Sequence, residues 1–536
     1  MIFSENRFTL FGIMRGWGAR KLGVPTLLTI RVPTIVALSR FALAIFLAGA
    51  LSSASAQEAK DSPQKQPSRS EQRDNGKGVL RLLPPDAISD HSIATGNTKL
   101  DYTATAGTLA FYDQSGEQSA AVFYTAYVAK NAPANRPLTF VFNGGPGAAS
   151  AYLHLGLVGP RVLDLGPKSH DAARAELRDN PDTWLAFTDL VLVDPIGTGW
   201  SRAVKADEAK QFWNVASDAG AMAKAIALYV AKNNRTASPK YLLGESYGGI
   251  RAAKTARALQ RDQGIAVNGI VMLSPLLEGW LTFGDDSSAL HSALKLPSLA
   301  AAALERKNAF TPEALAAAEK FAMTEYLTTI AAAPPQGAAA DAFYQKVAQI
   351  TGMPLEAVKK SRGFISDDYV KGLRMADGKI VSRYDASFAV DDPFPEQRGS
   401  RGNDPILDGV SRVYGGAFAS YARNELGFKT DMTYALLAGD VTGGWDWKGG
   451  RYQAGSEEDL RVLLAYSPSF RLLIAHGRSD MVTPYGMTRY LLDHLPALDP
   501  PGRAQLKLYR GGHMVYLDPA SRKAFSADAA AFYRGE

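Results

Sequence analysis

Three side chains of this 536-residue sequence have the types and the neighbours needed for nucleophilic catalysis: Ser246, Asp480 and His513. Ser246 lies in the sequence G-E-S-Y-G at 244–248, between a short apolar strand and the start of an alanine-rich helix. A serine on so tight a strand-to-helix turn needs small neighbours on both sides, so this spacing is a steric requirement. The pattern predicts a nucleophile elbow, which would present Ser246 to the carbonyl carbon of a substrate.

Two later segments supply partners for this serine in the chain order serine, acid, histidine. The apolar run 472–475 is a predicted strand followed by a loop with Asp480, and the run 506–509 leads through two glycines to His513. Each candidate follows the carboxyl end of a predicted strand, where open α/β sheets place their active sites. The sequence therefore predicts a catalytic triad of Ser246, Asp480 and His513.

These assignments have alternatives. Asp480 could instead cap a helix that begins near Val482-Thr483-Pro484. His513 competes with His476, which sits at a strand end and is expected to be structural. The other histidines lack a comparable position, namely His91, His154, His170, His291 and His494. Ser246 as an ordinary turn serine is the weakest alternative, because it leaves the ordered acid and histidine unexplained.

The segments around these residues predict an α/β fold. Short apolar runs bounded by turns, at 138–142, 190–193 and 270–273, are typical of buried parallel strands. Alternating segments at 102–109 and 122–128 predict antiparallel strands before them. Apolar residues then recur at helical spacing and predict a crossover helix, namely Val215, Ala219, Met222, Ile226 and Tyr229.

The stretch 284–455 is predicted to be an insertion between two parts of the sheet, because no convincing strand appears until Leu472. Thr311 and Pro312 open a helix that runs to about Phe321, and the segment 353–358 opens another. We expect this helical insertion to cover the active site as a cap, since functional residues gather in loops at strand ends. A separate helical domain without contact with the site is the alternative.

Several blocks in the same order resemble serine carboxypeptidases of the α/β-hydrolase fold, and they span most of the chain after about residue 138. The blocks are Asn143-Gly144-Gly145-Pro146-Gly147, Asn180-Pro181 with Trp184, Asp194-Pro195-Ile196-Gly197-Thr198-Gly199-Trp200-Ser201, Gly244-Glu245-Ser246-Tyr247-Gly248-Gly249, the strand ending at Asp480, and Gly512-His513-Met514-Val515. The resemblance implies an α/β-hydrolase fold with a mostly parallel central sheet and an inserted, largely helical cap. Its parts would be core residues 80–283 and 456–536, with the cap at 284–455.

The resemblance also implies roles for residues around the triad. The backbone N–H groups of Gly145 and Tyr247 would form the oxyanion hole, and the matching substrate-binding positions are Asn143, Gly144 and Glu245. In the family, the terminal carboxylate of the substrate is held by this asparagine and by the glutamate before the nucleophile. A second glutamate, fourteen positions after the asparagine, completes the site.

The position of that second glutamate is Leu157 in this chain, so the carboxyl pair of the family is broken. Two nearby carboxyl groups share a proton and can therefore donate to a carboxylate in acid. Without the partner, we expect Glu245 to recognise a free C-terminus more weakly or in a different way. Arg251 could supply a compensating charge, although a surface arginine on a helix is the more ordinary interpretation. Tyr516 replaces the proline usual after His-Met-Val, which is expected to reshape the leaving-group pocket.

The sequence thus predicts a serine-type carboxypeptidase that releases C-terminal residues from peptides through an acyl-enzyme on Ser246. The alternative is an esterase or acyltransferase with the same triad, which Leu157 favours. A catalytically inactive binding protein does not explain the intact triad and oxyanion block. No cofactor or metal is expected, because no H-E-x-x-H or Walker sequence is present and the chain has no cysteine. Peptide substrates are the expected partners, and the sequence does not indicate an oligomeric state.

The basic charge of the chain is concentrated at its start. Residues 1–56 hold six basic residues and one acid, a net +5 of the +6 of the whole chain. An apolar run at 41–51 and the residues Ala54-Ser55-Ala56 predict a secretory signal peptide cut before Gln57, and hence export to the periplasm or the medium. An uncleaved membrane anchor is the alternative. Residues 57–79 are polar and predict a disordered linker. The remaining net charge, near +1, gives no reason to expect nucleic acid or stable membrane insertion.

Overall fold

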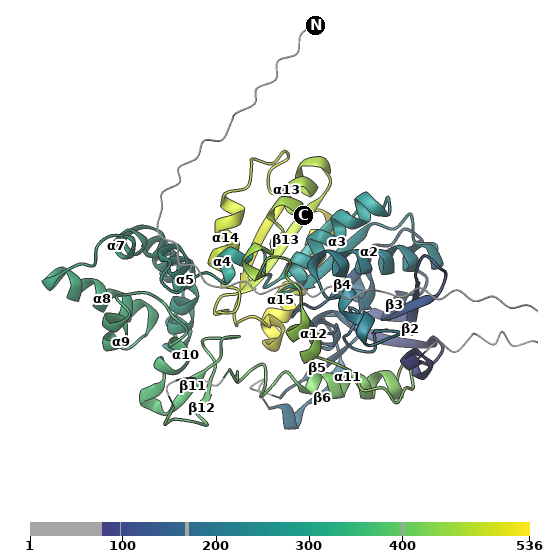
Figure 1. Cartoon of the computed structure of the whole chain (residues 1–536), viewed down its shortest axis with the longest axis horizontal. Helices are drawn as coiled ribbons and strands as arrows, with labels where there is room; N and C mark the ends of the chain where they lie inside the picture. Colours follow the sequence, from purple (N-terminus) through teal and green to yellow (C-terminus); the bar gives the residue numbers. More distant parts are fainter. Residues whose placement is uncertain (1–77, 97, 167–170, 398, 400–401) are drawn as a thin grey trace, which may run out of the picture. The chain divides into compact units, whose positions relative to one another are not determined.

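The computed structural model describes residues 78–96, 98–166, 171–397, 399 and 402–536 (Figure 1). The predicted signal peptide, its cleavage site and the linker up to residue 77 lie outside the described residues. The first described element is the 3-10 helix η1 (Gly78–Leu82). Over the described ranges, none of the helices combines the length and the apolar composition that crossing a membrane requires.

The main sheet has ten strands in the order β1-β2-β3-β7-β4-β9-β10-β13-β14, with β8 paired to β3. The pairs up to β3 and β7 are antiparallel, and the pairs from β7 to β14 are parallel. The strands are β1 (Ala87–Thr95), β2 (Thr98–Tyr112), β3 (Gln118–Ala129), β4 (Leu138–Phe142), β7 (Asp189–Val193), β8 (Arg202–Ala203), β9 (Lys240–Glu245), β10 (Gly269–Leu273), β13 (Arg471–Gly477) and β14 (Ala504–Tyr509). The mixed sheet of the α/β-hydrolase fold, with antiparallel strands before the parallel ones, is confirmed.

Helices and two small sheets complete the described chain. The α-helices are α1 (Ala151–Leu153), α2 (Val215–Lys232), α3 (Gly248–Asp262), α4 (Gly279–Thr282), α5 (Ala289–Arg306), α6 (Pro312–Phe321), α7 (Leu327–Ala331), α8 (Gly337–Thr351), α9 (Leu355–Lys360), α10 (Tyr369–Gly372), α11 (Val413–Asn424), α12 (Gly439–Gly444), α13 (Glu457–Tyr466), α14 (Tyr485–Asp493) and α15 (Pro519–Arg534). The small sheets pair β5 (Arg161–Asp164) with β6 (Glu176–Asp179), and β11 (Lys379–Val381) with β12 (Ala389–Asp391). Short 3-10 and π helices are η2 (His154–Val158), η3 (Ala172–Arg174), η4 (Trp184–Ala186), η5 (Asp207–Phe212), η6 (Ala322–Tyr326), η7 (Met375–Asp377), η8 (Arg451–Gln453) and η9 (Val515–Leu517).

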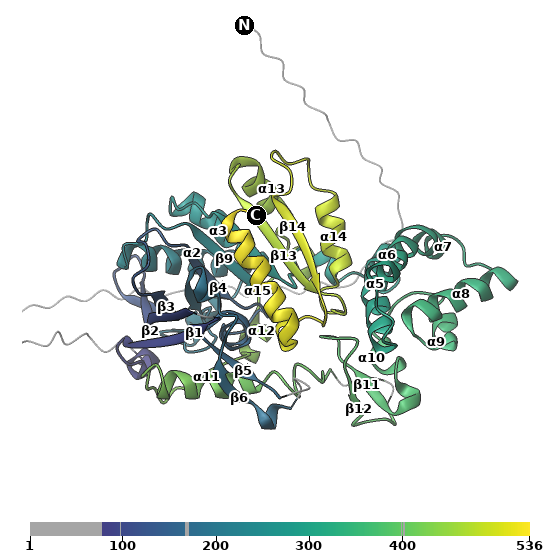
Figure 2. The same ribbon diagram turned by 180° about the vertical axis from the view of Figure 1, so that it is seen from behind.

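Successive side chains of the strands enter two separate cores, one on each face of the sheet, because strand residues alternate in direction. On one face, Leu242 and its equivalents pack against α2, α3, α13 and α14. On the other face, Leu243 and its equivalents pack against η2, α11 and α15. Figure 1 shows α2 and α3 in front of the sheet. Figure 2, the view from behind, shows α15 in front of the opposite face. Burial on both faces explains why the parallel strands read as continuous apolar runs.

The chain between β10 and β13 forms the predicted helical insertion. Helix α6 begins where the sequence predicts it, and the Thr311 side chain accepts a hydrogen bond of 3.1 Å from the backbone N–H of Ala314. Helices α5, α8 and α10 share a separate apolar core with the β11–β12 hairpin. Residues from Ile406 to Leu436 instead contribute to the core that contains α15. The insertion therefore leaves the sheet after α4 and packs on it again before α12.

Candidate active site

Ser246 lies on the tight turn between β9 and α3, as the elbow motif predicts. Its backbone has φ of 60°, a left-handed conformation that is rare for a residue with a side chain. A Cβ atom on Gly244 would lie 2.0 Å from the carbonyl oxygen of Gly248, so only glycine fits on the strand side of this turn. The turn leaves the Ser246 side chain partly exposed while its neighbours on both sides are buried.

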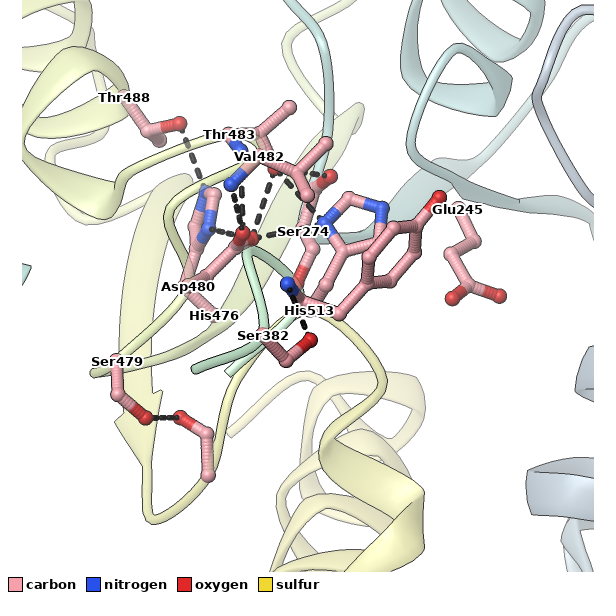
Figure 3. A network of polar contacts seen from close by, with 12 residues as sticks. Glu245, Ser274, Ser382, His476, Ser479, Asp480, Val482, Thr483, Thr488 and His513 are labelled. Carbon is pink, nitrogen blue, oxygen red and sulfur yellow. Dashed lines mark hydrogen bonds and ion pairs between the residues drawn. The ribbon is translucent and has the colours of Figure 1, made fainter. Parts of the chain in front are cut away.

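His513 and Asp480 form a buried pair after β14 and β13. Their Nδ1 and Oδ2 atoms are 2.9 Å apart, and the two side chains are 3% and 0% exposed. Because Asp480 accepts the proton on Nδ1, the other nitrogen of His513 is left without a proton and can act as a base. Figure 3 shows the His513 ring with Asp480 on one side and Glu245 on the opposite side of the view.

Asp480 does not cap the following helix, since α14 begins at Tyr485 after Pro484 and its first turn receives no side-chain cap, so this alternative is wrong. Its Oδ1 atom accepts hydrogen bonds from the backbone N–H groups of Val482, at 2.8 Å, and Thr483, at 3.1 Å. The Thr483 hydroxyl lies 2.9 Å from Asp480 Oδ2 and 2.8 Å from the carbonyl oxygen of Ser274. One carboxylate oxygen is thus fixed by the backbone, which aims the other at the imidazole (Figure 3).

The charges of this pair support each other. Burial disfavours the ionised form of Asp480, but the nearby His513 outweighs it and holds the pKa of Asp480 below its usual value. Burial also disfavours the charged imidazole, yet Asp480 raises the pKa of His513 above 6.5. This pair is the arrangement that a general base needs, because the imidazolium formed during proton transfer is stabilised.

The hydroxyl of Ser246 makes no hydrogen bond within the described part of the chain, and none joins it to His513. Such contacts are often loose in a hydrolase without substrate and tighten when substrate binds. The placement of the strands still supports the predicted triad, because β9, β13 and β14 are parallel and end at the same edge of the sheet. Ser246, Asp480 and His513 each follow one of these ends.

Gly145 and Tyr247 have the free backbone donors that the predicted oxyanion hole requires. Over the described residues, neither N–H group donates to a backbone or side-chain acceptor. The loop after β4 lies directly against the elbow, since a Cβ atom on Gly144 would be 2.5 Å from the backbone nitrogen of Tyr247. Glycine at 144 therefore allows the two backbones to approach each other at the position where a substrate oxygen would bind.

Asn143 and Glu245 meet beside the nucleophile. The Asn143 amide nitrogen donates to Glu245 Oε2, and the Asn143 amide oxygen accepts from the backbone N–H of Leu153 at 3.1 Å. The second contact fixes which end of the amide faces the carboxyl group. Glu245 is 3% exposed, and burial is the main cause that raises its pKa to about 7.

Tyr516 is the third residue at Glu245, which its place in the sequence did not reveal. Its hydroxyl lies 3.2 Å from both Oε1 and Oε2 of Glu245. The tyrosine is 271 residues away along the chain, so only the fold joins the two. Leu157, by contrast, is a residue of η2 and is fully buried in the apolar core.

The ordinary interpretation of Arg251 as a surface residue is wrong, because its side chain is buried. Its Nε atom lies 2.7 Å from Asp218 Oδ2 on α2, and its Nη1 atom donates to the backbone carbonyl oxygen of Asn143. The guanidinium also lies 5.0 Å from the ring centre of Tyr247. Arg251 therefore joins α2, α3 and the loop after β4, and its charge is already paired with Asp218.

The tip of the β11–β12 hairpin holds the histidine and aspartate loops. The backbone carbonyl oxygen of Tyr384 accepts a 2.6 Å hydrogen bond from His513 N–H, and its ring meets the imidazole edge-on with centres 5.1 Å apart. The backbone N–H of Ala386 donates to Ser479, the residue before Asp480, at 3.0 Å. Residues of the insertion thus contact His513 and the loop of Asp480, two members of the predicted triad, although no local sequence signal marked this hairpin.

The remaining candidates have structural contacts. His476 is buried in β13, where its Nε2 atom lies 2.8 Å from the Thr488 hydroxyl and burial lowers its pKa to about 4. His154 is also buried, and its Nε2 atom lies 2.7 Å from the Tyr127 hydroxyl. Asn180 donates to the backbone carbonyl oxygens of Leu157 and Gly159, both at 2.8 Å. No group of His, Asp and Glu suited to a metal ion occurs among the described residues.

Comparison with known proteins finds a family whose model matches part of this chain. The family model of the serine carboxypeptidases matches residues 98–279, which include the loop after β4 and the elbow. Over these residues the chain is similar to serine carboxypeptidases. Serine carboxypeptidase-like 41 of Arabidopsis thaliana is 30% identical over 168 residues, 29% of this chain. Serine carboxypeptidase-like 44 of the same plant is 37% identical over 81 residues, 15% of this chain.

These alignments cover 34% and 16% of the two plant serine carboxypeptidase-like proteins, so the chain matches well under two thirds of their length. A solved structure, the prohormone-processing carboxypeptidase Kex1 from Saccharomyces cerevisiae, aligns with 85% of this chain and 92% of its own. The sequence identity is 16% and the TM-score is 0.49.

Proposed function

We propose that this chain is a serine-type carboxypeptidase that removes residues from the C-termini of peptides. The buried hydrogen bond between Asn143 and Glu245, directly before the nucleophile, carries this proposal. With its raised pKa, Glu245 is protonated in mildly acidic solution and can donate a hydrogen bond to a substrate carboxylate. Simple ester hydrolysis does not require a protonated carboxyl group at this position.

The proposed reaction uses the predicted triad. Ser246 attacks the last peptide carbonyl, His513 takes the hydroxyl proton, and Asp480 stabilises the imidazolium. The N–H groups of Gly145 and Tyr247 donate to the oxygen that becomes negative, a contribution of about 3 kcal/mol for each donor. His513 then protonates the leaving amino acid, and water releases the acyl group from Ser246 by the same steps in reverse.

The composition of residues 1–56 supports a further part of the proposal, namely that the chain is exported and works in the periplasm or the medium. N-terminal sequencing of the mature protein after expression with its own leader tests this part. A mature N-terminus at Gln57 is expected, and an intact leader would contradict it.

The activity is tested with an N-blocked dipeptide, its C-terminal amide and a simple ester, each assayed from acidic to neutral pH. We expect amino acid release from the free acid to exceed cleavage of the amide below pH 7 and to disappear in Ser246→Ala. Ser361→Ala, in the helical insertion, is the matched control and keeps the activity. Cleavage of the ester alone, or equal rates on acid and amide at every pH, would favour an esterase or acyltransferase.

A further inference from the structure

The ring of Tyr516 fits beside Glu245 because residue 156 is a glycine. A Cβ atom on Gly156 would lie 2.5 Å from Cδ2 and Cε2 of the Tyr516 ring, so the ring needs glycine at that position. The neighbouring residue, Leu157, is apolar and fully buried in the core, so it cannot serve as a second carboxyl group. Glycine at 156 thus admits the Tyr516 ring, and residue 157, where the resemblance would place a second glutamate, carries no carboxyl group.

The hydrogen bonds of Glu245 determine where its proton sits. Asn143 can only donate from its amide nitrogen, because Leu153 fixes the amide oxygen as an acceptor. The Glu245 Oε2 atom is therefore held as an acceptor, and the proton of the neutral form belongs on Oε1. The Tyr516 hydroxyl lies at 3.2 Å from both oxygens and can donate to the ionised carboxylate or accept from the neutral acid.

Tyrosine and glutamate differ as partners of Glu245. Burial raises the pKa of Tyr516 well above 10, so its hydroxyl stays neutral wherever Glu245 titrates. A second carboxyl group would add a charge and would share one proton with Glu245 in two coupled steps. A hydroxyl adds a hydrogen-bond donor without a charge, and such a donor lowers the pKa of Glu245.

We propose that the Tyr516 hydroxyl takes the place of the second carboxyl group of the family, so that Glu245 binds the terminal carboxylate of the substrate as a single acid held by tyrosine. This inference rests on the proposed function. Tyr516 acts through Glu245 and is a positioning residue. It orients the carboxyl group of Glu245 and sets the pH at which this group ionises. The neutral acid can donate a hydrogen bond to the substrate carboxylate, whereas the ionised form repels it.

The other ionisable groups near Glu245 come from several elements. They are His513 and Asp480 of the triad, and Tyr152, Tyr384, Tyr414 and Tyr516. The triad pair affects every substrate alike. The ratio of KM for a free acid to KM for the matching amide therefore isolates Glu245, because only the acid carries the terminal charge. In the wild type this ratio should rise through a single ionisation near pH 7.

The experiment measures KM and kcat from pH 5 to 9 for an N-blocked dipeptide and its C-terminal amide. The proteins are the wild type, Tyr516→Phe and Tyr509→Phe. Tyr509 is a matched control, since its hydroxyl bonds the Asp528 carboxylate at 2.7 Å away from Glu245. In Tyr516→Phe we expect the rise of the KM ratio to move upward by about one pH unit, with kcat changed by about threefold or less. Tyr509→Phe should match the wild type.

A direct titration separates this inference from the proposed function. The ¹³C signal of the Glu245 carboxyl group, identified by its loss in Glu245→Gln, reports the pKa without any substrate. This pKa should rise in Tyr516→Phe and fall when 3-fluorotyrosine, a stronger donor of nearly the same size, replaces Tyr516. The fluorinated protein also provides the answer if the phenylalanine variant does not fold.

An unchanged Glu245 titration in the Tyr516 variants, or two coupled ionisations in the wild type, would overturn the inference. Failure of the wild type to cleave any free acid, with ester cleavage intact, would instead overturn the proposed function and the carboxylate-binding part of this inference. The ¹³C titration would still decide whether tyrosine controls Glu245.

Discussion

Arg251 and Asp218 form an ion pair beneath the elbow in which the two side chains are 0% and 4% exposed. The same guanidinium donates to the backbone of Asn143, so one cation connects the crossover helix α2 to the loop of the predicted oxyanion hole. Burial raises the pKa of Asp218, and Arg251 opposes that effect. The pair therefore links the stability of the fold to the position of the site.

The first prediction concerns this pair. Asp218→Ala should lower the free energy of unfolding by about 3–5 kcal/mol, because it leaves a buried guanidinium without its partner. Urea denaturation measures the change. The control is Asp459→Ala, which removes the partly exposed partner of Lys254 and should cost about 1 kcal/mol or less. Equal losses in the two variants would contradict the assignment.

The second prediction concerns Asp480. Asp480→Asn should keep the backbone contacts of Oδ1 but present an amide N–H to His513, which stabilises the wrong tautomer of the imidazole. We expect kcat to fall by about 10⁴ with little change in KM. Steady-state kinetics on the free-acid dipeptide measure it, with Asp528→Asn as the control. A loss below about tenfold would remove Asp480 from the triad.

The third prediction concerns Gly144. A methyl group on Gly144 would collide with the backbone nitrogen of Tyr247 and separate the two predicted oxyanion donors. Gly144→Ala should therefore lower kcat by about 10²–10³ while KM changes much less. Gly220→Ala is the control, because a methyl group on this residue of α2 meets no atom within 4 Å. A folded Gly144→Ala protein with normal kcat would argue against this oxyanion hole.

The fourth prediction concerns stability and pH. The pKa of Glu245 is about 7 in the folded protein and 4.5 in the unfolded chain. Between these values the folded state binds the proton more tightly, so the contribution of Glu245 to stability is present below pH 4.5 and is lost as pH rises through 7. The stability of the wild type relative to Glu245→Gln should decline by about 3 kcal/mol across this window.

Urea denaturation of both proteins at pH 4.5, 5.5, 6.5 and 7.5 measures this difference. Charges common to the two proteins cancel in the comparison. A difference that stays constant, or that grows with pH, would mean that Glu245 is already ionised in the folded protein at pH 5.

The sequence was sufficient for the elements that depend on local chemistry. The parallel strands are short apolar runs because both faces are buried, and the elbow needs its glycines within a few residues of Ser246. Asp480 and His513 could be found because each directly follows a strand. The cap of α6 by Thr311 likewise needs only adjacent residues.

Contacts made by the fold could not be predicted in the same way. Arginine is ordinarily exposed, and nothing near Arg251 marks Asp218 as its buried partner. Tyr516 reads as a departure from a family pattern, whereas its hydroxyl reaches a glutamate on another strand end. The residues from Ile406 to Leu436 return to the core of the sheet, which their place within a long helical insertion does not indicate.

The parts of the insertion differ in how much change they tolerate, because the backbone of Tyr384 and Ala386 at the hairpin tip bonds the loops of His513 and Asp480. Helices α8 and α9 could be lengthened or shortened while the loops of His513 and Asp480 kept their backbone contacts. Insertion or deletion of one residue in the hairpin would shift the backbone groups that bond the loops of His513 and Asp480. Changes in the outer helices therefore leave the surroundings of His513 and Asp480 intact, whereas changes in the length of the hairpin do not.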